Sequence, residues 1–99
     1  MPEIEIKVDS ETGDFTYTRS VCHASPSDPI SWVANGDWAV MFTGQTPLNT
    51  AEIRGRAGRV SPPARVSREA AKGLYHYAVA VAVGTRVFLD AGCPTIVIG

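Results

Sequence analysis

Apolar and polar residues alternate along most of this chain, which is the pattern of β-strands that bury one face. In the segment 3–8, isoleucine and valine alternate with glutamate and lysine, as in a strand with one wet face. The same pattern, together with β-branched and aromatic content, predicts further strands at 15–18, 21–24, 30–34, 38–43, 73–83, 86–90 and 94–98.

The segment 73–83 shows the clearest alternation in the chain. One of its faces carries two tyrosines and three valines: Tyr75, Tyr77, Val79, Val81 and Val83. The opposite face carries mainly alanine, which on its own is a helix former. Valine and tyrosine at every second position favour a strand instead, so we predict one strong strand here.

Glycine, proline and asparagine mark the breaks between the expected strands. Asn35-Gly36 separates two strand-like segments, 30–34 and 38–43, and both residues tolerate a positive φ. We therefore predict a β-hairpin at this position. Trp32 lies on the first of its strands, and its large aromatic area predicts a place in the core.

The middle of the chain, at about 44–72, differs from the rest. It holds three prolines and three glycines and shows little clean periodicity, so we expect a long loop. Within this loop we expect one short strand near 64–66. The segment 67–72 has the length of one helical turn, with Ser67 as its N-cap.

Length and composition indicate one ordinary globular domain over residues 1–99. Hydrophobic residues make up 44% of the chain and charged residues 19%, which is too apolar for a disordered chain. With seven or eight short strands and regular turns, the predicted fold is all-β, a two-sheet Greek-key sandwich.

No signal for a particular compartment is visible. The longest apolar run, 78–83, is too short to span a bilayer, so we expect no membrane insertion. The first residues lack the basic start and apolar run of a signal peptide. As written, the chain is expected in the cytoplasm, or outside it if an N-terminal signal was removed, so its localisation stays unknown.

Three parts of the sequence, at 30–42, at 73–77 and at Asp90 with 94–98, resemble the cupredoxin family. The segment 30–42, which reads ISWVANGDWAVMF, is similar to the central hairpin of cupredoxin-like domains. The segment 73–77, GLYHY, resembles the Gly-x-Tyr-x-Tyr strand that enters the copper loop of the family. Asp90 and the segment 94–98 resemble its last strand. The resemblance implies a cupredoxin-like sandwich, and it covers most of the chain apart from 44–72.

The blue-copper site of that family uses two histidines and a cysteine, with a weak axial methionine. By the resemblance, one histidine position falls on Trp38 or Ala39, the cysteine position on Val79 and the second histidine position on Ala82. None of these side chains offers a lone pair, so the resemblance implies the fold without a copper site or cofactor. Trp38 would then cover the position of the family's copper site with apolar surface. By the same resemblance, cupredoxin-like proteins without copper ligands look like scaffold or interaction domains.

The other metal-binding residue types are scattered along the chain. Cys22 and His23 are adjacent on an expected strand, so their side chains point to opposite faces. His76, Cys93 and Met41 lie far away, and no close C-x-x-C pair exists. We expect free thiols and no native metal site. A residual metal-binding or electron-transfer role would need these cysteines and histidines to converge in space.

The sequence gives no support for an enzyme. A catalytic histidine needs an orienting acid and a nucleophile within reach, and no motif links His76 to a serine or cysteine. No G-x-S-x-G nucleophile elbow is present either. We therefore expect a non-catalytic protein in which His76 is an ordinary structural histidine.

Charge is distributed unevenly along the chain, although the net charge is only −1. Five arginines and one lysine lie between positions 54 and 72, with Glu69 as the one acid, a local balance of +5. The arginines that we consider as an anion or partner site are Arg54, Arg56, Arg59, Arg65 and Arg68.

Such a cluster has three interpretations. It binds an anion or polyanion, it is a solvated loop, or it pairs with the acidic segment 1–14, whose balance is −4. Gly55 and Gly58 would let the backbone approach a ligand closely. No aromatic residue stands among the arginines, so a stacking platform for nucleic acid is not expected.

Taken together, these patterns favour a non-catalytic binding or protein-interaction module. It would act through an exposed sheet edge, through the loop end of the sandwich or by self-association. Its partner would be an unknown protein or a second copy. Anion binding by the arginine-rich segment is the alternative, and a residual metal or electron-transfer role is the second alternative.

Overall fold

The computed structural model describes residues 3–91 and 94–99. The part of the chain so described folds into β-strands joined by turns and loops, without a helix. The strands are β1 (Glu3–Val8), β2 (Phe15–Tyr17), β3 (Val21–Ala24), β4 (Pro29–Ala34), β5 (Asp37–Met41), β6 (Glu52–Gly55), β7 (Ala64–Arg65), β8 (Gly73–His76), β9 (Ala78–Val83), β10 (Arg86–Asp90) and β11 (Thr95–Ile98). No helix that would cross a membrane is found among these residues.

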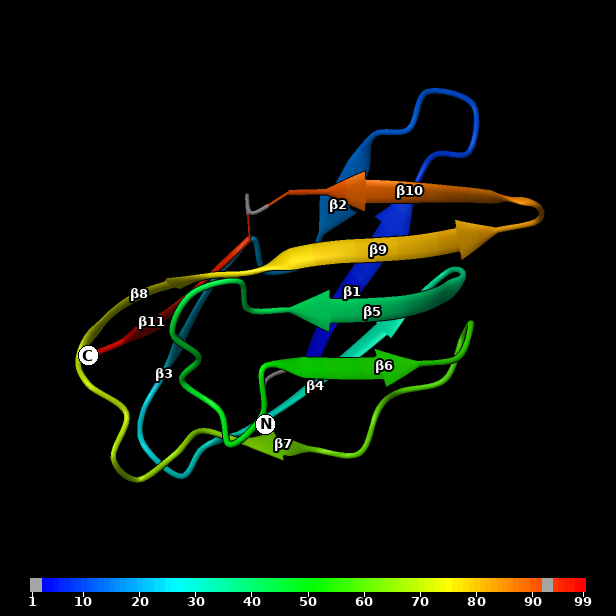
Figure 1. Ribbon diagram of the computed structural model, residues 1–99. Coiled ribbons are helices and arrows are strands. Elements are labelled where there is room, and N and C mark those ends of the chain that lie inside the picture. The colour runs from blue at the N-terminus through cyan, green and yellow to red at the C-terminus, as the bar shows by residue number, and fades with distance from the viewer. Residues whose placement is uncertain (1–2, 92–93) are drawn as a thin grey trace.

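The strands form three hydrogen-bonded sheets in two layers (Figure 1). One layer is the sheet β2-β1-β4-β7, in which β1 and β4 run parallel. The other layer joins the sheet β10-β9-β5-β6 to the smaller sheet β3-β11-β8. The join is nearly continuous because β8 and β9 are separated only by Tyr77, whose backbone N–H donates to the Pro94 carbonyl at 3.1 Å. The predicted all-β sandwich is confirmed.

One cluster of apolar side chains fills the space between the layers. Its members include residues that the alternation of apolar and polar positions assigned to the inward faces of the strands. Val79 and Val81 of β9 and Trp32 of β4 have no exposed surface. The aromatic centre is Tyr77, whose ring lies 5.9 Å from Trp32 and 5.3 Å from Phe42. The Trp32 indole N–H donates to the Tyr77 hydroxyl at 3.4 Å, so the polar tip of this buried tyrosine is bound inside the core.

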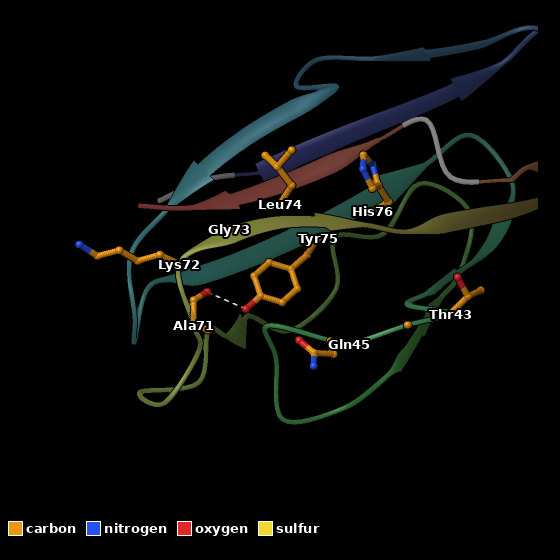
Figure 2. Close-up of a pocket in the computed structure, with 9 residues that line it drawn as sticks. Thr43, Gln45, Ala71, Lys72, Gly73, Leu74, Tyr75 and His76 are labelled. Carbon is orange, nitrogen blue, oxygen red and sulfur yellow. Dashed lines mark hydrogen bonds between the residues drawn. The ribbon is translucent and has the colours of Figure 1, made fainter.

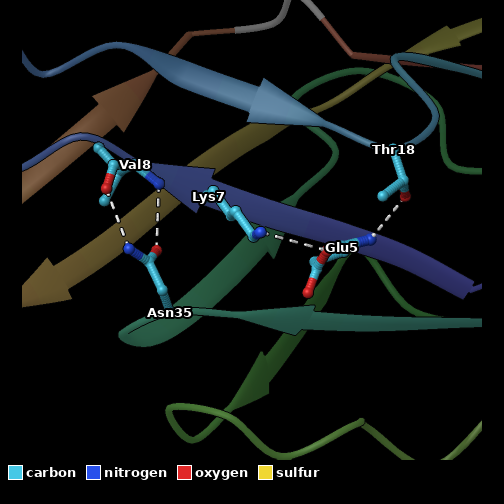
Figure 3. A network of polar contacts seen from close by, with 5 residues as sticks. All are labelled: Glu5, Lys7, Val8, Thr18 and Asn35. Atoms are coloured by element: carbon cyan, nitrogen blue, oxygen red, sulfur yellow. Dashed lines mark hydrogen bonds and ion pairs between the residues drawn. The ribbon is translucent and has the colours of Figure 1, made fainter.

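The predicted hairpin at Asn35-Gly36 is wrong. β4 and β5 belong to different layers and do not pair, and neither of the two turn residues has a positive φ. The Asn35 side chain instead binds the end of β1: its Oδ1 accepts from the Val8 N–H at 3.1 Å and its Nδ2 donates to the Val8 carbonyl at 3.0 Å (Figure 3). Gly36 passes so close to the Ala82 carbonyl that a Cβ would overlap it. The chain therefore crosses from one layer to the other here.

β1, which Asn35 fixes at one end, is also bound near its middle. The Glu5 N–H donates to the Thr18 hydroxyl at 2.9 Å, and the Lys7 ammonium lies 3.8 Å from the Glu5 carboxylate (Figure 3). The ion pair is exposed and contributes little to stability. The backbone contacts of Asn35 and Thr18 fix the register of β1 between β2 and β4, on which the inward direction of its isoleucines depends.

The segment 44–72 is more ordered than the sequence predicted. The expected short strand near 64–66 is found as β7, but β6 was missed because its alternation lasts only four residues. In place of the expected helical turn over 67–72, Ser67 begins a single turn, in which the Ala70 N–H donates to the Ser67 carbonyl at 3.1 Å. This turn does not continue as a helix. The strand predicted over 73–83 is divided at Tyr77. These differences raise the number of strands above the seven or eight expected.

The segment that follows β6 closes one side of the sandwich. β6 pairs with β5 in one layer, and β7 pairs with β4 in the other. Between them the Ser61 hydroxyl accepts from the Trp32 N–H at 3.0 Å, and the Ser61 N–H donates to the Trp32 carbonyl at 2.8 Å. Ser61 and β7 thereby cover the edge of β4. This part of the arginine-rich segment 54–72 therefore has a structural role.

Gly55 has a packing role rather than the ligand-binding role that its position predicted. It lies opposite Trp38 in the register of β5 and β6. The Trp38 side chain is buried, and its indole ring occupies the space where a Cβ on Gly55 would stand. Among the described residues, the Trp38 indole nitrogen is the buried side-chain polar atom without a hydrogen-bond partner. The indole is thus held by packing alone.

We predict that Gly55→Ala destabilises the fold. The new methyl group would overlap the buried Trp38 ring, and such overpacking typically costs about 1–3 kcal/mol. Gly44→Ala is the matched control, since nothing lies within 4 Å of a Cβ there and Gly44 has no positive φ. Urea unfolding followed by tryptophan fluorescence measures both. Equal midpoints for the two variants would contradict this packing.

A second prediction concerns alkaline pH. Burial raises the pKa of Tyr77 to about 12, although its bond with Trp32 acts in the opposite direction. Because the folded-state pKa lies above the unfolded value of about 10, the contribution of Tyr77 to stability is complete below pH 10 and is lost as the pH rises from about 10 to 12. The loss amounts to roughly 2–3 kcal/mol.

The measurement compares urea unfolding of the wild type and Tyr77→Phe at several pH values above 9. Removal of the hydroxyl leaves the Trp32 N–H without its partner, so the variant starts at lower stability. Its stability nevertheless falls less steeply between pH 10 and 12, because it lacks one titrating group. Parallel curves for the two proteins would show that Tyr77 does not titrate with folding.

Candidate functional site

The outer face of the sheet β10-β9-β5 is apolar across three strands. The strand register sets Val87 opposite Ala82 and Leu89 opposite Ala80. On the other side of β9, Ala39 of β5 lies opposite Ala80. These residues point away from the core, because the buried residues Val40, Val81 and Phe88 alternate with them along the three strands. We call this face the β10 surface, which consists of Ala39, Met41, Ala80, Ala82, Val87 and Leu89.

The most prominent side chains of the β10 surface are the two large ones on its edge strand. Val87 is 66% exposed and Leu89 is 70% exposed. Beside them the alanines of β9 and β5 form a flat floor of small side chains. The solvent face of an antiparallel sheet normally carries polar residues, and contiguous exposed apolar patches mark binding surfaces. This face therefore has the composition of a contact surface.

Polar residues border the β10 surface. On the side of β6, the Arg54 guanidinium binds the Glu52 carboxylate with Nε 2.5 Å from Oε2, and this carboxylate raises the pKa of Arg54. Asp37, opposite Ala82, lies at the end of β5. An apolar centre with a charged border is the usual anatomy of a protein interface.

β10 is also a free sheet edge in the described structure (Figure 1). The two-residue turn Gly84-Thr85 connects β9 and β10, so Val83 and Arg86 form the first hydrogen-bonded pair of the hairpin. Hydrogen-bonded and non-hydrogen-bonded pairs alternate along an antiparallel ladder. The backbone N–H and C=O groups of Val87 and Leu89 therefore point away from β9, toward the side where the sheet ends.

The inner side of β10 is fixed to the other layer. The Phe88 ring is buried, and the Arg86 guanidinium lies 4.8 Å from its centroid while donating to the Ser10 carbonyl at 3.0 Å. At the far end of the strand, the Tyr17 hydroxyl donates to the Asp90 carboxylate at 2.6 Å. These contacts anchor both ends of β10 to the other layer and so fix the position of its free edge.

A separate cleft of about 370 Å³ lies between the segments 43–45 and 71–76 (Figure 2). Tyr75 forms one wall, and its hydroxyl donates to the Ala71 carbonyl at 2.6 Å. His76 and Lys72 point away from the Tyr75 ring, and the His76 Nδ1 lies 2.9 Å from the Thr95 hydroxyl oxygen. The titratable side chains of this cleft do not converge on a common point, so it lacks the geometry of an acid–base site.

The predicted arginine site is divided into three parts. Arg54 is paired with Glu52 at the border of the β10 surface, and not with the acidic segment 1–14. Arg56 and Arg59 flank one tight turn, in which the Arg59 N–H donates to the Arg56 carbonyl at 3.1 Å. The turn contains Gly58 at a φ of 70°, a left-handed conformation that suits glycine.

Arg65 and Arg68 are the two members of the set that share a cleft. It has a volume of about 450 Å³ and is lined also by Asn49 and Ser67. One guanidinium N–H of Arg65 donates to the Ser27 carbonyl at 3.2 Å. The five candidate arginines therefore do not share one cleft: Arg54 lies on β6, Arg56 and Arg59 lie in the turn that follows it, and Arg65 and Arg68 line the cleft together.

The positions that the family resemblance assigned to copper ligands do not lie together on one surface. Trp38 and Val79 are buried in the core, whereas Ala82 lies on the outer face opposite Val87. Cys22 is buried and His23 is exposed, so the two adjacent residues point to opposite faces, as predicted.

The environment of the thiol follows from this placement. Burial raises the pKa of the Cys22 thiol, with Arg19 acting in the opposite direction, so the thiolate is disfavoured. Cys93 lies outside the described residues, so its predicted state as a free thiol stays a prediction. Within residues 3–91 and 94–99, no three histidine, cysteine, aspartate or glutamate side chains are grouped as a metal ion would require.

Comparison with known proteins supports the fold and does not extend to a function. No protein-family model matches the sequence, and no curated protein matches it. Among solved structures, a pseudoazurin from Sinorhizobium meliltoi is similar over 100% of this chain and 75% of its own, with a TM-score of 0.55 and 20% sequence identity. The chain therefore has a cupredoxin-like fold, as the sequence resemblance implied.

Proposed function

We propose that this cupredoxin-like chain is a non-catalytic protein-interaction module and that it binds a protein through the β10 surface. The observation that carries the proposal is the apolar outer face formed by β10, β9 and β5, with Val87 and Leu89 exposed by two thirds or more. Burial of apolar surface contributes about 25 cal/mol per Å². Covering this face by a partner is therefore favourable, whereas leaving it in water is not.

The shape of the surface supports a flat, sheet-like contact. Alanine side chains on β9 and β5 are short, so a partner can come close to the backbone of this sheet. Val87 and Leu89 stand above that floor at the edge and would fill recesses on the partner. Next to them, the outward backbone groups of β10 offer hydrogen bonds of the strand-addition type. Binding thus combines apolar contact with directional pairing.

A photo-crosslinker tests this function. We predict that a benzophenone amino acid in place of Leu89, irradiated in a lysate of the producing cells, forms a defined covalent adduct with a protein that mass spectrometry identifies. The same group in place of Val60 is the matched control, since Val60 is also exposed, at 50%, but lies outside the β10 surface. Equal or absent adducts at both positions would contradict the proposal.

A second candidate function is anion binding at the cleft that contains Arg65 and Arg68. Two guanidinium groups with Asn49 and Ser67 nearby supply donors that suit sulfate or phosphate. Glu69 lines the same cleft and would weaken binding of a dianion.

This candidate predicts that inorganic sulfate shifts the backbone NMR signals around Ser67 and that its affinity falls as sodium chloride is added. Arg65→Ala combined with Arg68→Ala should weaken sulfate binding about tenfold or more. Arg54→Ala combined with Arg56→Ala is the control and should bind as the wild type does. Binding that is indifferent to salt and to both pairs of substitutions would remove this candidate.

A further inference from the structure

The sequence of β10 is complementary to itself when it is read in the opposite direction. It begins with Arg86 and ends with Asp90, and Val87 and Leu89 flank Phe88 at the centre. In an antiparallel pair of two such strands centred on Phe88, each arginine faces an aspartate and each valine faces a leucine. Opposite charges directly across a strand pair are stabilising, and like charges are destabilising.

From this complementarity we propose that a second copy of the chain pairs antiparallel with the free edge of β10, about a two-fold axis at Phe88. The inference goes beyond the proposed function, since this pairing uses the edge of β10 and leaves the apolar outer face of the sheet accessible. It is an isologous contact, in which the same strand of each copy meets the other. The pairing occupies the free β10 edge of both copies, so no further copy can add to β10 and the assembly stops at a dimer.

The backbone groups of β10 agree with this register. Val87 and Leu89 direct their N–H and C=O groups outward, as the alternation of the β9–β10 ladder requires. With Phe88 at the centre, Val87 of one copy faces Leu89 of the other as a hydrogen-bonded pair, and the symmetry gives two such pairs. The Phe88 residues then form the non-hydrogen-bonded pair between them.

Other registers fail on charge or on side-chain direction. Parallel pairing in register would set Arg86 against Arg86 and Asp90 against Asp90. An antiparallel pair centred on Val87 or Leu89 would keep the hydrogen-bonding pattern of the backbone. Arg86 of one copy would then no longer face Asp90 of the other. A centre between two residues would pair inward-facing with outward-facing side chains, which breaks the continuity of both faces.

The two charged residues can make the new contact while they keep their present ones. Arg86 donates one of the five N–H groups of its guanidinium to Ser10, and its position over Phe88 holds it close to the strand. A carboxylate accepts more than one hydrogen bond, so Asp90 can bind a guanidinium of the second copy in addition to the Tyr17 hydroxyl. The dimer would therefore contain two Arg86–Asp90 pairs at the ends of the shared ladder.

The dimer joins two four-stranded sheets into one sheet of eight strands. On its outer face, Val87 of each copy packs beside Leu89 of the other, and the two alanine floors become continuous. A contact of one short strand is smaller than a standard interface of about 1,600 Å², so we expect a dimer that dissociates on dilution.

Sedimentation equilibrium of the purified chain over a range of concentrations tests the inference. The wild type should show a reversible monomer–dimer equilibrium. Arg86→Asp and Asp90→Arg should each weaken self-association about tenfold or more, because each brings like charges together across the ladder. Arg59→Asp is the control, since it changes charge by the same amount away from β10 and should dimerise normally. Circular dichroism checks that each variant is folded.

The decisive sample is a mixture of Arg86→Asp with Asp90→Arg. One variant then carries two acids on β10 and the other carries two arginines, so the mixed pair regains attraction at both ends. A heterodimer should form at protein concentrations at which each variant alone stays largely monomeric. This gain of association cannot come from loss of folding.

The outcomes separate this inference from the proposed function. A monomer at all concentrations, with a benzophenone at Leu89 that captures a different protein, overturns the second-copy inference and leaves the interaction module standing. A monomer with no adduct at Leu89 overturns both. A dimer that persists in both charge variants, or a mixture that forms no heterodimer, places self-association on another surface and overturns the β10 pairing.

Discussion

The packing of Tyr77 between the layers is the contact on which the rest of the structure depends. Its ring meets Trp32 of the opposite layer, and its backbone N–H binds the Pro94 carbonyl at the point where β8 becomes β9. It therefore joins the small sheet to the large one and both of them to the other layer. The direction in which β9 leaves this point decides where the β9–β10 hairpin lies, so the surface that we propose for binding is positioned by a residue in the core.

The alternation of β9 has different consequences on its two faces. Its inward valines, Val79 and Val81, bury completely and would be enough to hold the strand in place. The outward residues are then free to be polar, as on most solvent faces of antiparallel sheets. They are alanines instead, and the neighbouring strands add Met41 and Leu89. A face that stability does not require to be apolar, but that is apolar across three strands, is more simply explained by contact with another molecule than by folding.

Much of the fold could be predicted from the sequence, because period-two alternation directly encodes which residues face inward. The shared face of the tyrosines and valines of 73–83 was predicted from this pattern, and the buried Trp32 was predicted from its large aromatic area. What failed depends on tertiary partners. Asn35-Gly36 has the composition of a hairpin turn, yet the Asn35 side chain binds Val8 across 27 positions and leads the chain to the other layer. The local sequence contains no sign of that contact.

The candidate site was harder to predict for a related reason. Five arginines looked like one surface because they are close in sequence, but β6 and β7 belong to different sheets and separate them. Val87 and Leu89 gave no signal, since a strand with apolar residues on both faces reads as a buried strand. Only the arrangement of the layers shows that the outward leucine meets water rather than a second layer, and only the sheet order shows that β10 is an edge. An edge strand with opposite charges at its ends has no built-in repulsion toward its own copy in the antiparallel direction. Charges, prolines, bulges and covering segments are the usual protections of an edge strand, and among these β10 has no proline and no charge that repels its own copy in the antiparallel direction.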